Sequence, residues 1–314
     1  MKEIIFPKIN EIKGPPAIQK NGMIYPRASE MSIFVHKGRL KYLVNGPKGD
    51  RNRIGSAWTG DYLTREEYPS FGGKGAFYSA YCENDTVYAF ATLDNKVIKY
   101  VSEDLYHWSD GEVIVTFPEN FKLYNTAVCK GDDGYVIAVE CGYEIDAEGN
   151  TMPNEYIGVH FTEFFAKSKD LSKWELLPFE KSYNRHRYIA CPAMEYCEGY
   201  YYMICLEELP ALRYAPYIYR TKDFETWEVG FYNPLLMPSR EDLSPKPGVI
   251  IPQERLDKNF QNLNTNNSDV DLCEFEGKTY IFYCSGNQGN TWGGTYCEAV
   301  FDGTLAEFLK ANFS

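Results

Sequence analysis

The sequence predicts an all-β fold, a five-bladed β-propeller that occupies residues 1–314 as a single domain. Three observations predict it: a strand–turn–strand unit that recurs five times, a tryptophan-containing motif that follows the second strand, and a scarcity of helical patterns. Four-stranded sheets repeated around an axis form a propeller. A β-sandwich is the main alternative, but it does not account for five similar units that share a terminal motif.

The first repeat has the pattern of a β-hairpin. Each copy begins with a short apolar run, continues with a turn of Gly, Asn or Asp, and ends with a run rich in Tyr, Val, Ile and Phe. These turn residues adopt the positive φ angles that tight hairpins require. The five copies span residues 29–46, 77–92, 124–140, 190–207 and 267–288.

The second repeat reads Ser/Thr-x-Asp-Leu/Phe-x-x-Trp and occurs at residues 102–108, 168–174 and 221–227. Its Asp can cap a tight turn through the side chain. We expect each Trp to begin an outer strand and to pack between neighbouring units. Residues 59–68 resemble a degenerate copy in the first unit, and residues 302–309 are expected to close the last unit.

Two segments interrupt the repeats. Residues 141–160 follow the third hairpin, and residues 233–266 precede the fifth. Both are long and rich in polar residues, Gly or Pro, so they are predicted as loops. The best helical pattern, EFLKANF, is short and lies near the C-terminus.

Composition argues against several classes of function. The formal net charge is −12 and no basic stripe occurs, so nucleic acid is not an expected partner. No run of about 18 apolar residues predicts a membrane span. The N-terminus lacks a signal-peptide pattern and the nine cysteines lie singly in apolar runs, so we expect reduced thiols in a cytoplasmic protein. No metal or cofactor motif occurs, and no feature indicates an oligomeric state.

Propeller geometry selects candidate site residues without any further information. The first strands of all units start at one mouth of the central axis, and the second strands return to it. Polar side chains at these buried ends cost desolvation energy unless they are hydrogen-bonded or functional. We therefore expect one central pocket to be formed by Glu30, Asn125, Glu140, Glu207 and Asp269.

This layout resembles the five-bladed propeller glycoside hydrolases, a superfamily that includes families 43, 32, 62 and 117. The resemblance implies a general base at the start of blade one, a pKa-tuning Asp at blade three and a general acid at blade four. Glu30, eight residues before Gly38, stands at the first position, and Asn125, nine before Gly134, at the second. Ala190 occupies the acid position, and Asp269 stands where family 43 often has His. A different family on the same fold fits these departures.

Glycoside hydrolysis requires one carboxyl group that protonates the leaving oxygen and another that activates water or attacks the sugar. Glu30 and Asp269 form the first candidate pair, and they belong to adjoining units. Asp271 shares a strand face with Asp269 and is the alternative there. Glu207 ends a buried aromatic run, where burial can raise its pKa as a general acid requires.

Further residues are candidates for binding the substrate. Amide and carboxylate groups can bind sugar hydroxyls, and the cations near the start of blade four can tune a pKa or bind an acidic sugar. The alternative for each is a structural role at the rim or in a solvated loop. The candidates are Asn125, Glu140, Arg27, His186, Arg187 with its neighbour Arg185, and the Gly-rich pair Gln288 and Trp292.

The sequence therefore predicts a glycosidase that acts on an oligosaccharide or glycoside by paired-carboxylate chemistry. A glycoside phosphorylase on the same fold is one alternative, in which phosphate replaces water and Arg185 and Arg187 face the pocket. A non-catalytic carbohydrate-binding propeller is the other, and Ala190 at the acid position is its best support.

Overall fold

The computed structural model describes residues 4–5, 14–25, 30–46, 55–142, 144–145, 151–152, 161–184, 186–211, 213–261, 263–287 and 292–314. Strands account for 56% of the structure and helices for only 8%, which confirms the all-β class. No described helix has both the length and the apolar character to cross a membrane.

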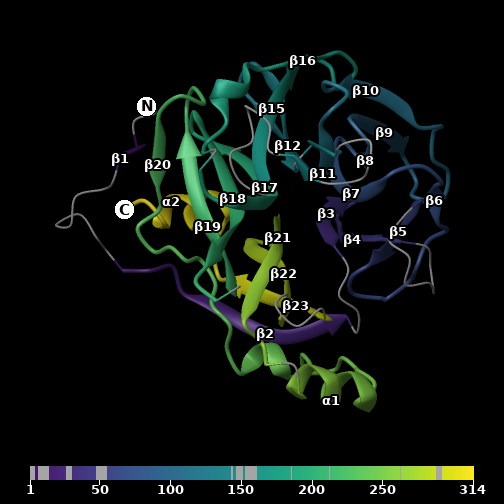
Figure 1. Cartoon of the computed structure of the whole chain (residues 1–314). Coiled ribbons are helices and arrows are strands. Elements are labelled where there is room, and N and C mark those ends of the chain that lie inside the picture. The colour runs from purple at the N-terminus through teal and green to yellow at the C-terminus, as the bar shows by residue number, and fades with distance from the viewer. Residues whose placement is uncertain are drawn as a thin grey trace.

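Each of the five copies of the first repeat folds as an antiparallel hairpin, as predicted. The first strands lie around the centre in Figure 1, with their partners outside them. The hairpins are β3 (Met31–His36) with β4 (Arg39–Asn45), β7 (Ala76–Glu83) with β8 (Thr86–Leu93), β11 (Lys122–Gly131) with β12 (Gly134–Gly142), β17 (Ile189–Cys197) with β18 (Tyr200–Leu209), and β21 (Asn266–Phe275) with β22 (Lys278–Asn287).

Two further strands extend each hairpin outward, and we number the resulting units 1 to 5 along the chain. In unit 5 the outermost strand comes from the N-terminus, because β2 pairs with β23. The outer strands are β5 (Ser56–Asp61) and β6 (Phe71–Gly72), β9 (Lys96–Ser102) and β10 (Glu112–Thr116), β15 (Phe161–Ser168) and β16 (Trp174–Leu176), β19 (Arg213–Thr221) and β20 (Trp227–Val229), and β23 (Trp292–Phe301) and β2 (Ile18–Tyr25).

Units 1 to 3 are separate four-stranded sheets. Units 4 and 5 join through one parallel pair, Tyr214 with Asn266, into a nine-stranded sheet that also includes β1 (Ile4–Ile5) on the edge of β20. A small additional sheet pairs β13 (Glu144–Ile145) with β14 (Thr151–Met152). The propeller class is confirmed, whereas the count of five blades and the single domain over 1–314 stay predictions.

The second repeat caps turns and packs between units as expected. Asp104 Oδ1 accepts the backbone N–H groups of Tyr106 and His107, each at 2.8 Å, and Asp170 and Asp223 bond in the same way. Each Trp contacts an aromatic ring of the preceding unit: Trp108 on Phe71, Trp174 on Phe90 and Trp227 on Phe165. Trp174 and Trp227 begin outer strands, but Trp108 precedes β10 by several residues.

Two predictions about helices and loops need correction. The segment 233–266 contains the 3-10 turn η3 (Glu241–Leu243) and the helix α1 (Gln253–Gln261), where only a loop was expected. This helix has only two apolar residues, Leu256 and Phe260, so its helical pattern is weak, and it lies beside β2 away from the centre (Figure 1). Residues 302–309 lead into the helix α2 (Leu305–Ala311), and β2 closes the last unit instead.

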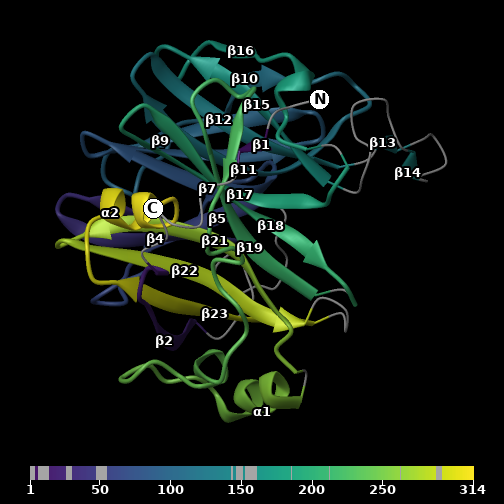
Figure 2. The same cartoon turned by 90° about the vertical axis from the view of Figure 1, so that its left-hand side faces the viewer.

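Figure 2 shows the units from the side, with α1 at one edge and α2 against the strands of units 4 and 5. A short 3-10 turn, η2 (Phe179–Lys181), connects units 3 and 4. Most of the predicted loop 141–160 lies outside the described residues. All nine cysteines are unpaired, which agrees with the expectation of reduced thiols, while the cytoplasmic location stays a prediction.

Candidate active site

Four of the five inner strands carry a β-bulge close to where they start. The pairing register shifts between residues 76 and 79, 123 and 126, 190 and 193, and 268 and 271. Bulges of this kind re-aim side chains and occur often next to active sites. Three residues at the first bulged position have left-handed backbones, a strained state for residues other than Gly: Phe77 (φ 54°), Cys191 (φ 51°) and Asp269 (φ 50°).

The register also corrects one equivalence. The residue of unit 3 that matches Asp269, Cys191 and Phe77 is Tyr124, whereas Asn125 is one residue further along. Counting back from the hairpin turn missed this difference because hairpin lengths differ between units. Asn125 nevertheless reaches the axis.

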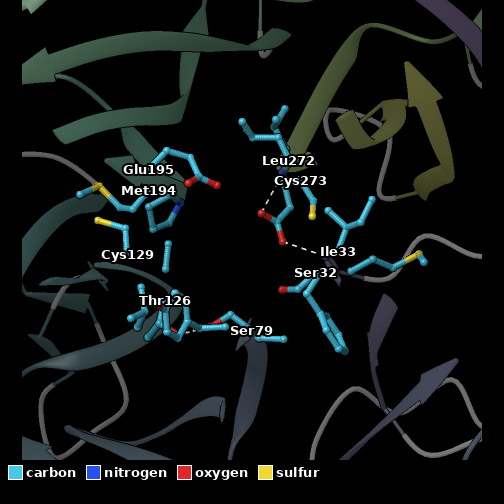
Figure 3. Close-up of a pocket in the computed structure, with 18 of the residues that line it drawn as sticks. Ser32, Ile33, Ser79, Thr126, Cys129, Met194, Glu195, Leu272 and Cys273 are labelled. Atoms are coloured by element: carbon cyan, nitrogen blue, oxygen red, sulfur yellow. Dashed lines mark hydrogen bonds between the residues drawn. The ribbon is translucent and has the colours of Figure 1, made fainter. Parts of the chain in front are cut away.

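The inner strands surround a cavity of about 380 Å³. One end of the cavity, which we call the mouth, lies where the inner strands start and is lined by Glu30, Asn125, Cys191 and Asp269. From there the cavity follows the same strands as far as the exposed Lys130 and Glu274. Figure 3 shows side chains from these strands around the cavity, including Ser79, which bonds to Thr126 at 2.7 Å. Glu30 and Asp269, from opposite ends of the chain, therefore line one cavity, as the sequence predicted.

Glu140 lies directly behind the mouth and does not line the cavity. Its Oε2 accepts a hydrogen bond from Asn125 Nδ2 at 3.0 Å and from the backbone N–H of Cys191 at 2.8 Å. Burial raises the pKa of Glu140 to about 7, against the lowering effect of these two bonds. Glu140 thus holds the bulge of β17 in place rather than contacting a ligand. Asn45 holds the bulge of β7 similarly, by bonding to the backbone of Tyr78.

Tyr296 joins the two strands that carry the paired carboxylates. This fully buried side chain comes from β23, and its hydroxyl donates to the backbone carbonyl of Asp269 at 2.9 Å. The same oxygen accepts the backbone N–H of Met31, next to Glu30, at 2.9 Å. One hydroxyl therefore connects unit 5 to unit 1 and fixes the strained backbone at Asp269.

Glu207 does not share the cavity, contrary to expectation. On β18 it shares a strand face with Cys205 and Met203, which pack into the core between units 3 and 4, so its side chain points into that core. It is 1% exposed and forms an ion pair with Arg187. Burial raises its pKa to about 7, and the Arg187 charge opposes the rise.

Sequence reasoning missed a third glutamate in the same core. Glu163 of β15 is fully buried and pairs across the strands with Glu140. Neither of its carboxyl oxygens has a hydrogen-bond partner in the described part of the chain. Burial raises the pKa of Glu163 well above its usual range, and the neighbouring Glu140 adds to the effect. The signal for this residue was a lone carboxylate within the apolar run FTEFFA.

The structure describes only some of the cationic and Gly-rich residues that the sequence predicts at the site. Arg27, Arg185 and Gln288 lie outside the described residues, as does the side chain of Trp292. His186 is exposed, and its backbone N–H bonds to the Asn184 side chain. Arg187 pairs with Glu207, and neither His186 nor Arg187 lines the cavity.

Further along the inner strands, the cavity is lined by a second carboxyl pair, Asp271 and Glu195. Asp271 accepts the backbone N–H groups of Ile33 at 3.0 Å and of Leu272 at 2.9 Å, so it ties β21 to β3. Glu195 points toward the centre of the cavity in Figure 3. Burial raises the pKa of Asp271 to about 7 and that of Glu195 to about 8. The bonds of Asp271 give it a structural role, which leaves Asp269 as the carboxylate of this strand at the mouth.

Among the described residues, no group of three or more His, Cys, Asp or Glu side chains is arranged to hold a metal ion. The described residues at the mouth offer carboxylates, an amide and a thiol as chemical groups. Burial raises the pKa of the Cys191 thiol well above its usual range, with further contributions from Asp269, Glu140 and Glu30. A thiol in that state is a poor nucleophile.

Comparison with known proteins places the fold. No protein-family model and no curated protein matches the chain. Similar solved structures include a thermostable family-43 glycoside hydrolase (TM-score 0.55, 11% identity, 92% of this chain and 90% of that chain) and a Bombyx mori family-32 β-fructofuranosidase (TM-score 0.56, 11% identity, 88% and 61%). An α-L-arabinofuranosidase from Podospora anserina, in complex with cellotriose, is also similar (TM-score 0.52, 9% identity, 95% and 96%).

The chain shares the propeller fold of these glycoside hydrolases. The similarity covers most of the chain and includes structures of families 43, 32 and 62, so the resemblance seen in the sequence is confirmed at the level of the fold. No single family is resolved among them.

Proposed function

We propose that this protein is a glycoside hydrolase that cleaves an oligosaccharide or glycoside at the mouth of the central cavity. One observation carries the proposal: Glu30 and Asp269 line the same cavity where the inner strands start. The fold, shared with solved glycoside hydrolases, supports the same conclusion.

The two carboxyl groups have different roles in the cleavage of the glycosidic bond. One donates a proton to the leaving oxygen, and the other activates water or attacks the anomeric carbon. Ala190 is buried and carries no ionisable group, so the acid comes from another strand than in family 43. Asn125 is placed to bond a sugar hydroxyl, while Glu140 positions Asn125 and Cys191 from behind.

Hydrolysis is favoured over phosphorolysis by the charges around the cavity. Of the described residues that line it, Lys130 is the one cation, and it lies exposed beside Glu83 at the other end of the inner strands, away from the mouth. Arg187 is engaged with Glu207. A phosphate dianion would therefore meet carboxylates at the mouth without a compensating charge from these residues.

Assay of the full chain against a panel of nitrophenyl glycosides and oligosaccharides tests the proposal. We expect turnover in phosphate-free buffer, at a rate that added phosphate does not raise. Turnover that requires phosphate would identify a phosphorylase instead. Saturable sugar binding without turnover of any substrate would identify a carbohydrate-binding propeller.

Removal of the Tyr296 hydroxyl should lower kcat more than it changes KM. In Tyr296→Phe the backbone at Asp269 loses its link to β3, and a small displacement of a reacting group is costly. We expect kcat to fall by about tenfold and KM to change by less than about threefold. In the Asp269→Asn background, Tyr296→Phe should lower kcat little further, because Tyr296 acts through the position of Asp269.

Tyr283→Phe is the matched control for this prediction. Tyr283 is also fully buried, and its hydroxyl bonds to Asp242 at 2.6 Å, away from the cavity. Its loss should lower the melting temperature to a similar degree and leave kcat intact. Equal kcat losses in the two variants would show that Tyr296 acts through general stability alone.

A further inference from the structure

Five aromatic rings form a continuous chain beside the mouth. Consecutive ring centroids lie 5.3, 5.0, 5.3 and 5.4 Å apart, and the ring planes meet at 58° to 89°. We call these rings the aromatic arc; in order they are Phe77, Tyr124, Phe161, Tyr188 and Tyr214.

The topology places every member of the arc at the mouth end of its strand. Phe77 and Tyr124 occupy the first bulged positions of β7 and β11. Phe161 and Tyr214 lie at the start of β15 and β19, strands that run away from the mouth because they are antiparallel to β12 and β18. Tyr188 immediately precedes β17. The arc therefore extends over units 2, 3 and 4.

The arc is not part of the hydrophobic core. Its five side chains are only partly buried, and none belongs to, or packs against, the five clusters of buried apolar residues. The hydroxyls of Tyr124, Tyr188 and Tyr214 make no hydrogen bond to any other described residue. Contiguous apolar surface that remains outside the hydrophobic core commonly marks a binding site.

Gly142 shows how closely the middle of the arc is fitted. A Cβ atom at this position would lie 2.6 Å from the Tyr124 ring and 3.1 Å from the Phe161 ring. Glycine therefore permits both rings to lie over the end of β12. Any other residue would push them apart.

The arc adjoins the carboxylates of the candidate site. Burial raises the pKa of the Tyr188 hydroxyl, and Cys191, Glu140 and Asp269 add to the rise. Burial also raises the pKa of Tyr124, with a contribution from Glu140. Both hydroxyls stay protonated at neutral pH, so they can donate hydrogen bonds close to the mouth.

We infer that the aromatic arc binds additional sugar units of an oligosaccharide, beyond the unit held at Glu30 and Asp269. Aromatic rings pack against the C–H faces of sugars, and tyrosine hydroxyls bond to sugar hydroxyls. The arc presents rings and neutral hydroxyls, so its ligand class is an uncharged oligosaccharide. The inference rests on the proposed function, and it adds a preference for substrates of more than one sugar unit.

Chain-length dependence of turnover tests the inference. The wild-type protein and Tyr214→Ala are compared on a series of oligosaccharides of increasing length and on a short nitrophenyl glycoside with the same reacting sugar. We expect Tyr214→Ala to lower kcat/KM for the longer substrates by about tenfold, the effect of losing one aromatic contact. The short glycoside should change by less than about twofold, since it does not reach the outer end of the arc.

Phe161→Leu is a second variant that removes a ring while keeping most of its volume, and it should give the same pattern. Tyr106→Ala is the matched control, because Tyr106 is a half-exposed tyrosine that contacts one other ring and lies outside the arc. Equal effects on long and short substrates in both arc variants, or no effect on either, would overturn the inference. So would a wild-type kcat/KM that does not rise with chain length. The wild-type assay separates the two claims: if the protein turns over no substrate of the panel, the proposed function fails, whereas full turnover in Asp269→Asn would only remove Asp269 from the mechanism.

Discussion

Asp269→Asn and Glu30→Gln should each lower kcat by about 10²- to 10⁴-fold, the range for loss of a group that transfers a proton in the transition state. Each variant removes a carboxylate at the mouth of the cavity without removing core packing. Asn is also among the residues that best tolerate the left-handed backbone of Asp269, so the substitution keeps the bulge of β21. Initial rates on the best substrate of the panel, together with melting temperatures, measure both effects.

Glu119→Gln provides the control for this pair, since Glu119 is an exposed carboxylate in the turn between β10 and β11. It should match the wild-type protein in kcat and in melting temperature. Wild-type kcat in either mouth variant would remove that residue from the mechanism. A loss of rate that accompanies a large fall in melting temperature would mean that the carboxylate supports the fold.

The parts of this structure that the sequence predicts are those with local or repeated signals. The hairpins carry their turn residues and their apolar runs within about twenty positions, so each copy can be recognised alone. The Asp caps of the second repeat need only neighbouring residues. The convergence of Glu30 and Asp269 follows from the repeat itself, because equivalent strand ends meet at the axis.

What the sequence does not predict depends on register and on partners far along the chain. The hairpin of unit 3 is longer than that of unit 5 between the bulge and the turn, so Tyr124 rather than Asn125 matches Asp269. The inward turn of Glu207 depends on which face of β18 meets unit 3. The pairing of β2 with β23 joins residues near the two ends of the chain, and no local sequence pattern predicts this pairing.

Some errors came from polar residues whose environment the sequence does not reveal. Helix α1 has few apolar positions, and its stability draws on contacts such as the Glu254–Lys258 pair at 3.0 Å. A lone carboxylate in a strand is expected to face solvent, but the side chain of Glu163 is completely buried. Burial is a property of the packed neighbours, in this case those of unit 4, which lie later in the chain.

The second large effect is expected for the pH dependence of stability. Three glutamates, Glu140, Glu163 and Glu207, point into the core between units 3 and 4, and their shared neighbour Cys205 has a thiol pKa raised by burial and by all three. Arg187 reaches Glu207 from the preceding loop. Glu163 makes no hydrogen bond to a described residue, and burial raises its pKa well above its usual range.

The sign of the effect follows from that raised pKa. Below the unfolded-state pKa of about 4.5, Glu163 is protonated in both states and contributes no pH dependence. Above it, the unfolded chain ionises while the folded protein keeps the proton, so folding becomes less favourable as pH rises. The loss amounts to about 1.4 kcal/mol per pH unit until the folded-state pKa is reached.

Glu163→Gln removes the titrating group and keeps its shape. The free energy of unfolding is measured by urea denaturation at pH 4, 5, 6 and 7. In this variant we expect it to lack the part of the pH dependence that Glu163 causes in the wild-type protein. The variant should therefore match the wild-type protein most closely at pH 4 and exceed its stability by a growing margin toward pH 7, since the amide cannot ionise in the unfolded chain. Glu119→Gln, exposed in both states, should follow the wild-type curve throughout. Parallel curves for Glu163→Gln and the wild-type protein would show that Glu163 ionises in the fold, with a counter-charge that stabilises it between units 3 and 4.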